Sequence, residues 1–264
     1  MDLQLKGRTA LVSGSTLGIG FAIASTLARE GATVIVNGRT RERVDEAMAR
    51  MTTENPNARL RPAAADLSTA DGVAAVAKQY PDVDILVNNV GAFEAKPFFE
   101  IPDADWLYMW EMNVMSGARL SRQYMRGMLA RNWGRIIFIS SESGLNLPGE
   151  MIHYGVTKTA QLGLSRGLAE LTVGSAVTVN AVLPGPTRTE GVGEWLEGLA
   201  KQTGVSLAEV EKDFFEKTRP SSLIRRFADP TEVAALVAYV ASPLSALTNG
   251  AALRAEGGII HSIG

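Results

Sequence analysis

The chain has no cysteine among its 264 residues and only two histidines, His153 and His261. Disulfide bonds and thiolate metal sites are therefore excluded, and this composition suits a reducing compartment such as the cytoplasm. The two histidines stand far apart, and no His-x-x-x-His motif is present. Because the usual nitrogen and sulfur ligands of a metal ion are so few, we expect no metal site.

The chain also lacks an excess of charge and a long apolar run. Its formal net charge is -2 at pH 7, which provides no basic surface of the kind that binds nucleic acid or an anionic membrane. The most apolar segment, residues 233–247, is interrupted by Ser242, Pro243 and Ser245 and is too short to span a bilayer. We therefore expect a cytoplasmic protein that binds neither nucleic acid nor membrane.

What is present is the pattern of a globular α/β protein. Hydrophobic residues make up 46% of the chain, and short β-like runs alternate with longer helical patterns, as in a parallel sheet of βαβ units. The expected strands cover residues 9–13, 33–37, 59–65, 84–88, 134–140, 176–183 and 251–254. The expected helices cover residues 21–30, 40–51, 71–79, 103–131, 156–173 and 230–241. No repeat or linker is present, so residues 1–264 are expected to form one domain.

A glycine-rich turn, Gly14-Ser15-Thr16-Leu17-Gly18-Ile19-Gly20, joins the first expected strand to the helix after it. Glycines let the backbone turn tightly and approach a pyrophosphate, and the helix N-terminus offers free N–H groups. The spacing differs from the commoner Gly-x-Gly-x-x-Gly, and a plain strand-to-helix connection is the alternative. The position of the turn after the first strand favours dinucleotide binding.

The end of the second expected strand bears on the choice of dinucleotide. A carboxylate at this place would bind the ribose 2′-hydroxyl of NAD, whereas an arginine accommodates the 2′-phosphate of NADP. The chain carries Asn37, Gly38 and Arg39 here, with no acid and one base. NADP(H) is therefore the expected cofactor, with NAD(H) as the alternative.

Tyr154 and Lys158 lie four residues apart and would project from the same face of a helix. A free tyrosine has a pKa of about 10 and is a poor base at neutral pH. An ammonium about 4 Å from the phenol would favour the phenolate by roughly 4 kcal/mol, or about three pKa units, before desolvation is subtracted. Such a tyrosine could act as an acid–base group, although an ordinary helical Tyr-x-x-x-Lys pair is common.

The motifs resemble, in type and order, those of the short-chain dehydrogenase/reductase family, and the resemblance extends from about Lys6 to Gly258. The glycine turn is similar to that family's Thr-Gly-x-x-x-Gly-Ile-Gly, with Ser13 in place of threonine. The segment Asn88-Asn89-Val90-Gly91 is similar to its Asn-Asn-Ala-Gly, and Pro184-Gly185 matches its Pro-Gly. Leucine at position 17, where some NADP-using relatives carry a base, weakens the NADP(H) prediction.

The catalytic motif of the family also has counterparts. Tyr154 and Lys158 match its Tyr-x-x-x-Lys, and Ser141 lies 13 residues before Tyr154, the family's usual interval. The resemblance implies four catalytic residues, Asn113, Ser141, Tyr154 and Lys158. It implies that Tyr154 exchanges a proton with the substrate oxygen, which Ser141 also binds. Lys158 would lower the pKa of Tyr154 and hold the nicotinamide ribose, and Asn113 would hold a water in a proton relay.

The resemblance implies an α/β fold, namely a single-domain Rossmann-like doubly wound parallel sheet of about seven strands with helices on both faces and a small helical substrate lid. It implies an oxidoreductase of the EC 1.1.1 type that reversibly reduces a small-molecule carbonyl to a secondary alcohol, and commonly a homotetramer. The implied cofactor-binding residues are Gly14, Ser15, Thr16, Gly18, Ile19, Gly20, Asn37, Arg39, Asp66, Leu67, Asn89, Gly91, Tyr154, Lys158, Pro184, Gly185, Thr187 and Thr189.

A lid is expected over residues 187–225. The pattern of its residues predicts an amphipathic cover over a moderately apolar pocket. The apolar residues of this cover, some of which could instead pack within the lid, are Trp195, Leu196, Leu199, Phe214 and Phe215. Leu145, Leu147 and Met151 are expected to form another pocket wall. Two alternatives stay open. One is a 3-oxoacyl-thioester reductase that docks acyl carrier protein on Arg122, Arg126 and Arg131; the other is a non-catalytic dinucleotide-binding sensor or scaffold.

Overall fold

The computed structural model describes residues 1–263, and a seven-stranded parallel sheet lies at its centre. The strands are β1 (Thr9–Val12), β2 (Thr33–Gly38), β3 (Arg59–Ala64), β4 (Ile85–Asn88), β5 (Gly134–Ile139), β6 (Val177–Pro184) and β7 (Ala252–Ala255). Their order in the sheet is β3-β2-β1-β4-β5-β6-β7. The order reverses direction between β1 and β4, the kind of switch point where α/β sheets bind ligands.

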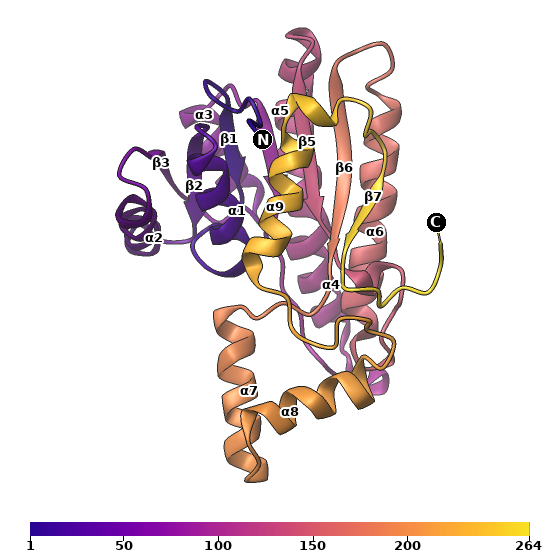
Figure 1. The fold of residues 1–264 in the computed structure, drawn as a ribbon. Helices are drawn as coiled ribbons and strands as arrows, with labels where there is room; N and C mark the ends of the chain where they lie inside the picture. The colour runs from indigo at the N-terminus through magenta and orange to yellow at the C-terminus, as the bar shows by residue number, and fades with distance from the viewer. Residues whose placement is uncertain (264) are drawn as a thin grey trace.

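Helices cover both faces of this sheet (Figure 1). One face packs against α1 (Gly18–Arg29), α2 (Arg41–Glu54) and α9 (Pro230–Ala241), and the other against α3 (Ala70–Gln79), α5 (Ser116–Ala130) and α6 (Ile152–Glu170). Residues of one strand alternate between the two cores: Ala10 and Val12 belong to the first, and Leu11 to the second. The predicted doubly wound α/β fold is therefore confirmed.

The expected helix over residues 103–131 is present from Asp103 to Ala130, but it contains a π-helical turn that was not predicted. The structure has α4 (Asp103–Trp110), then a π-helical turn (Glu111–Met115), and then α5. In that turn the Asn113 side chain forms hydrogen bonds with both backbone groups of Ala92, in the loop after β4. Such π-turns often occur at functional sites, and this one aims a buried amide at the carboxyl edge of the sheet.

Two smaller helices follow β6 and project beyond the carboxyl edge of the sheet, drawn in orange in Figure 1. They are α7 (Glu190–Thr203) and α8 (Leu207–Asp213), and a π-helical turn (Phe214–Thr218) continues α8. Leu196, Val210, Phe215 and Phe227 form a small separate core between them. Short 3-10 turns lie at Phe98–Glu100, Glu142–Gly144, Gly149–Met151 and Pro243–Ser245.

Across residues 1–263, no helix is both long and apolar enough to cross a membrane. The same residues contain no group of three or more histidine, aspartate or glutamate side chains placed to hold a metal ion.

Candidate functional site

The predicted motifs meet at the carboxyl edge of the sheet, around two neighbouring cavities. The first cavity, of about 390 Å³, is lined by the glycine turn after β1 and by the segments that follow β2, β3 and β4. The second, of about 560 Å³, is lined by the segments after β5 and β6, by α6 and by the lid helices. Ile19 and Thr189 line both cavities.

The glycine turn is fixed by hydrogen bonds from the neighbouring strand. Ser13 Oγ donates to the Val87 carbonyl and accepts from the N–H of Asn89, and Asn89 Nδ2 donates to the carbonyls of Ser13 and Gly14, each at 3.0 Å. A Cβ atom at Gly20 would overlap the Gly14 carbonyl and Asn89 Nδ2. Position 20 therefore requires glycine, because α1 and the glycine turn pack too closely there for any side chain.

Two predicted cofactor residues, Ser15 and Asn37, hold this turn in place. Ser15 Oγ accepts from the Asn37 N–H at 2.9 Å, and Ser15 is buried outside both cavities. The Asn37 side chain accepts from the Gly14 N–H and donates to the carbonyls of Ala63 and Ala65. Asn37 lines the first cavity, but its side chain is already bound to the protein.

Two arginines form the basic end of the first cavity. Arg39 was predicted from the sequence, whereas Arg43, which also lines the cavity, was not. Both residues are exposed, and neither guanidinium forms an ion pair within residues 1–263. They lie four residues apart around the start of α2, a spacing that could have revealed the pair. Two unpaired guanidinium groups suit a phosphate.

Asp66 and Leu67 line the first cavity together with these arginines. Asp66 Oδ1 accepts from the backbone N–H and the hydroxyl of Ser68. Tyr108 and Met112, from α4 and the π-helical turn, also line the cavity and were not predicted from the sequence as site residues.

Helix α6 places Tyr154 in the wall of the second cavity and Lys158 behind it. Ser141, which follows β5, lines the same cavity as Tyr154. Lys158 Nζ lies 5.6 Å from the centroid of the Tyr154 ring and donates to the Ile139 carbonyl at 2.9 Å. Burial lowers the pKa of Lys158 to about 7.

The expected lowering of the Tyr154 pKa by Lys158 is not found. Burial raises the pKa of Tyr154 to about 12, although the nearby Ser141 hydroxyl acts in the opposite direction. Lys158 does not offset this rise. Burial lowers the pKa of Lys158 itself and so disfavours its charged form, and its Nζ donates to the Ile139 carbonyl. Tyr154 therefore carries its proton at neutral pH, as a proton donor requires.

Asn113 lies behind the wall of the cavities, close to Lys158. Its side chain accepts from the Ala92 N–H at 2.7 Å and donates to the Ala92 carbonyl and to Thr157 Oγ1. A Cβ atom at Gly91 would lie 3.1 Å from Asn113 Oδ1 and 3.6 Å from Lys158 Nζ. The loop after β4, the π-helical turn and α6 therefore converge at Gly91.

The segment after β6 connects the two cavities to the lid. Pro184, Gly185 and Thr187 line the second cavity, and Thr189 lines both and caps the N-terminus of α7. The next residue, Glu190, accepts the N–H of Gly18 at 2.9 Å, with Arg50 3.8 Å from its other oxygen. Gly18 lines neither cavity. The lid is therefore bound directly to the glycine turn.

The expected apolar walls of the second cavity are partly confirmed. Trp195 and Phe214 of the lid and Met151 of the 149–151 turn line it. Leu196 and Phe215 are buried in the separate core of the lid, and Leu199 packs against that core. Leu145 and Leu147 do not line the cavity, because after the turn at Glu142–Gly144 their side chains face outward, 47% and 48% exposed.

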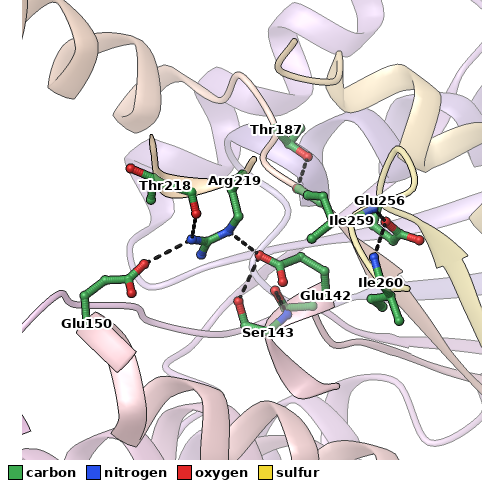
Figure 2. Close-up of polar contacts among 11 residues, drawn as sticks. Glu142, Ser143, Glu150, Thr187, Thr218, Arg219, Glu256, Ile259 and Ile260 are labelled. Atoms are coloured by element: carbon green, nitrogen blue, oxygen red, sulfur yellow. Dashed lines mark hydrogen bonds and ion pairs between the residues drawn. The ribbon is translucent and has the colours of Figure 1, made fainter. Parts of the chain in front are cut away.

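A buried ion pair in the second cavity was missed by the sequence analysis. Arg219 Nε donates to Glu142 Oε1 at 2.9 Å, and Arg219 Nη1 donates to Glu150 Oε1 at 3.0 Å (Figure 2). Glu142 directly follows Ser141, which could have drawn attention to it. Arg219 comes from the end of the lid, 77 residues further along the chain, and no local pattern pairs the two.

The two histidines take no part in the wall of either cavity. His153 is buried, with its ring in a T-shaped contact with Trp106 and Nε2 3.9 Å from a carboxylate oxygen of Glu94. His261 is exposed near the C-terminus.

Comparison with known proteins agrees with this geometry. The family model described as short chain dehydrogenase matches residues 8–200. An uncharacterized oxidoreductase of Bacillus subtilis (strain 168), YvaG, is 49% identical over the whole of both chains. The 3-oxoacyl-acyl-carrier-protein reductase FabG of Aquifex aeolicus is 30% identical over 98% of this chain and all of its own.

A solved structure extends the likeness to the whole fold. L-sorbose reductase from Gluconobacter frateurii, complexed with NADPH and L-sorbose, matches with a TM-score of 0.93 and 30% identity over the full length of both chains. Sequence, strand order and the placement of the motifs at the switch point therefore lead to the same conclusion. The chain belongs to the short chain dehydrogenase family of oxidoreductases.

Proposed function

We propose that the protein is an NADP(H)-dependent oxidoreductase that reduces a ketone to a secondary alcohol, reversibly. One observation carries this proposal: Ser141 and Tyr154 line the same cavity of about 560 Å³, and Lys158 lies behind the tyrosine ring. The adjoining cavity is lined by the glycine turn at the N-terminus of α1, so a dinucleotide bound there would lie beside the pair.

The residues of the first cavity fit NADP(H). The glycine turn lines this cavity at the N-terminus of α1, where a diphosphate could bind, and the unpaired Arg39 and Arg43 would hold the 2′-phosphate. Asp66 and Leu67 would contact the adenine, and Asn89 and Gly91 the ribose side. The similarity to a reductase complexed with NADPH supports the same choice.

In the proposed mechanism the protein positions the substrate and moves the proton. Bound NADPH would supply the hydride. Tyr154 donates its phenol proton to the carbonyl oxygen, and Ser141 donates a hydrogen bond to the same oxygen and stabilises the charge that develops there. Lys158, with its lowered pKa, exchanges protons at neutral pH and can return one to the tyrosine. Asn113 holds the loop of Gly91 and Ala92 against α6 and keeps this proton path in place.

Replacement of Tyr154 by phenylalanine tests the proposal. Tyr154→Phe should lower kcat about 1,000-fold, because it removes the proton donor and leaves the aromatic wall. NADPH affinity, followed by fluorescence titration, should stay within about twofold. Tyr239→Phe, on the exposed side of α9, is the matched control and should keep full activity.

A panel of carbonyl compounds decides between a ketone reductase, a 3-oxoacyl-thioester reductase and a non-catalytic sensor. NADPH and NADH oxidation at 340 nm would be followed with ketones, diketones and a 3-oxoacyl thioester. Retained turnover in Tyr154→Phe contradicts the mechanism, and a clear preference for NADH contradicts the role of Arg39 and Arg43. NADPH binding without turnover of any carbonyl would favour the sensor instead.

We also propose that the protein assembles into a homotetramer. Large apolar residues that are exposed just before α4 and on it support this assembly. Phe98 and Phe99 precede α4, and Leu107 and Trp110 lie on it; all four are exposed. A cluster of large exposed apolar side chains is typical of a surface that another subunit covers.

A further inference from the structure

The second cavity has more carboxylates than cations in its wall. Its charged lining residues are Glu94, Glu142, Glu150 and Arg219. Arg219 Nε donates to Glu142 Oε1, and Arg219 Nη1 donates to Glu150 Oε1 (Figure 2). The side chains of Arg219 and Glu142 are only 10% and 4% exposed, so the one guanidinium is largely covered and already paired. The charge that a ligand in this cavity can reach is therefore negative.

Glu94 and Glu150 are the accessible carboxylates of this wall, with side chains 47% and 48% exposed. The Glu94 carboxylate forms no hydrogen bond within residues 1–263, although Lys96 Nζ lies 3.8 Å from one oxygen and His153 Nε2 lies 3.9 Å from the other. Glu150 accepts from Arg219 through Oε1 alone. Both carboxylates therefore retain charge that the described part of the chain does not satisfy with donors.

The nearest cation, Lys96, does not reverse this charge. Its Nζ donates to a carboxylate oxygen of Asp105, and Lys96 does not line the cavity. The lysine and the aspartate offset each other, which leaves the charges of Glu94 and Glu150 in place. An anionic ligand would be repelled at this wall, and a cationic ligand would be attracted.

The two carboxylates belong to neighbouring segments close to Tyr154. The Lys96 N–H donates to the Glu150 carbonyl at 3.0 Å, so the chain around Glu94 runs beside the turn that contains Glu150. Phe93, which directly precedes Glu94, has its ring centroid 6.3 Å from that of Tyr154 in an edge contact. A substrate with its carbonyl at Tyr154 could therefore place a group several atoms away beside these carboxylates.

The exposed aromatic rings of the cavity suit a cation as well. Phe93 lies on the segment after β4 and Trp195 on α7, and both are exposed and line the cavity. Phe214 lines it too, in an edge contact with Trp195. Aromatic faces attract alkylammonium groups, so these rings would favour the same charge as the carboxylates.

We propose that Glu94 and Glu150 are specificity-determining residues, and that the substrate is a carbonyl compound with a cationic amine several atoms from its carbonyl. This inference rests on the proposed carbonyl reduction and names its substrate class. The carbonyl binds at Ser141 and Tyr154, and the amine binds between the two carboxylates and the aromatic rings.

Three methyl ketones of similar length test the substrate class on the unmodified enzyme. In 5-(trimethylammonio)-2-pentanone a quaternary nitrogen replaces the quaternary carbon of 6,6-dimethyl-2-heptanone, and the shape is otherwise the same. The third ketone, 5-oxohexanoate, carries a carboxylate instead. At low salt we expect kcat/KM for the cation to exceed that for its neutral isostere by at least about 10-fold. The anion should have the lowest value, and added salt should reduce the differences.

Substitutions at the two carboxylates test the contact itself. Glu94→Gln and Glu150→Gln keep the size of the side chain and remove its charge, and an amide oxygen at position 150 can still accept from Arg219. The ratio of kcat/KM for the cation to that for its isostere should fall about threefold in each variant and to about 1 in the double variant. A partly misfolded variant would lower both values alike and leave the ratio unchanged.

Glu170→Gln, on the exposed part of α6 and outside both cavities, is the matched control and should keep the ratio. If the unmodified enzyme uses the cation no better than its isostere, or if the preference persists in the double variant, the inference is overturned and the proposed function stands. Preferred use of 5-oxohexanoate has the same meaning. If NADPH oxidation occurs with none of these ketones and with no other carbonyl compound, both fail.

Discussion

Lys158 lies where burial disfavours its charged form. Its ammonium is buried beneath the Tyr154 ring, and burial lowers its pKa to about 7. In an unfolded chain the pKa of a lysine is about 10.4. Between these two values the unfolded chain binds more protons than the folded protein, so the folded protein gains stability as pH rises.

The free energy of unfolding should therefore increase from about pH 7 to about pH 10 by roughly 2–4 kcal/mol through Lys158 alone. Below pH 7 both states carry the proton and the contribution is constant. The raised pKa of Tyr154, about 12, acts only above about pH 10, where it lowers stability with rising pH. Lys158→Met should remove the rise.

Urea unfolding at pH 6, 7.5 and 9 measures this difference, with the exposed Lys78→Met as control. Parallel pH profiles for the unmodified protein and Lys158→Met would contradict the assignment.

Single residues differ in how far the sequence predicts them. Ser13, Gly20 and Gly91 stand in motifs whose intervals identify them, and the structure explains each residue type. The Ser13 hydroxyl links the ends of β1 and β4. A Cβ at either glycine would approach atoms of another segment of the protein too closely. Glu142 and Arg219 belong to no motif. Their importance arises only when the lid brings residue 219 to the end of β5, a contact between distant segments that local patterns cannot show.

Between elements, the contact of α7 with α1 bears on cofactor binding. The carboxylate of Glu190, the first residue of α7, is bound to the N–H of Gly18, the first residue of α1. A carboxylate at this positive end of the helix stabilises the lid contact, but it also repels a diphosphate proposed to bind at the same helix end.

Glu190→Gln should therefore tighten NADPH binding about two- to fivefold, because the amide can still accept from Gly18 and no longer carries charge. Fluorescence titration at low and high salt measures the effect, which should shrink as salt screens the repulsion. Glu194→Gln, exposed on the same helix, is the control. Weaker NADPH binding by Glu190→Gln would show instead that the carboxylate supports the site.

Whole elements are predictable where their signals are local. Helix α9 begins and ends at the predicted residues, because Asp229 and Glu232 form a capping box and Pro230 occupies the first helical position. The π-helical turn at Glu111–Met115 has no such signal. Its sequence suits an ordinary helix, and the cause of the turn is the hydrogen bonding of Asn113 to Ala92, 21 residues earlier.

At the scale of the whole molecule, the proposed homotetramer is the main expectation. Size-exclusion chromatography with light scattering should give four times the 28.2 kDa of one chain. Leu107→Glu and Trp110→Glu together should lower this mass, because they place charge in the exposed apolar surface that the assembly would cover. Leu171→Glu, at the far end of α6, is a control for the effect of added charge on solubility. A monomer in the unmodified protein would contradict the proposal.

The two cavities share a wall at Ile19 and Thr189, and this shared wall has a consequence for steady-state kinetics. A chain without cysteine has no dithiol in which to store two electrons between half-reactions. If the proposed dinucleotide and ketone occupy these adjoining cavities together, the hydride passes directly from one to the other. Double-reciprocal plots with both reactants varied should therefore intersect, as a ternary complex requires, and parallel lines should not be found.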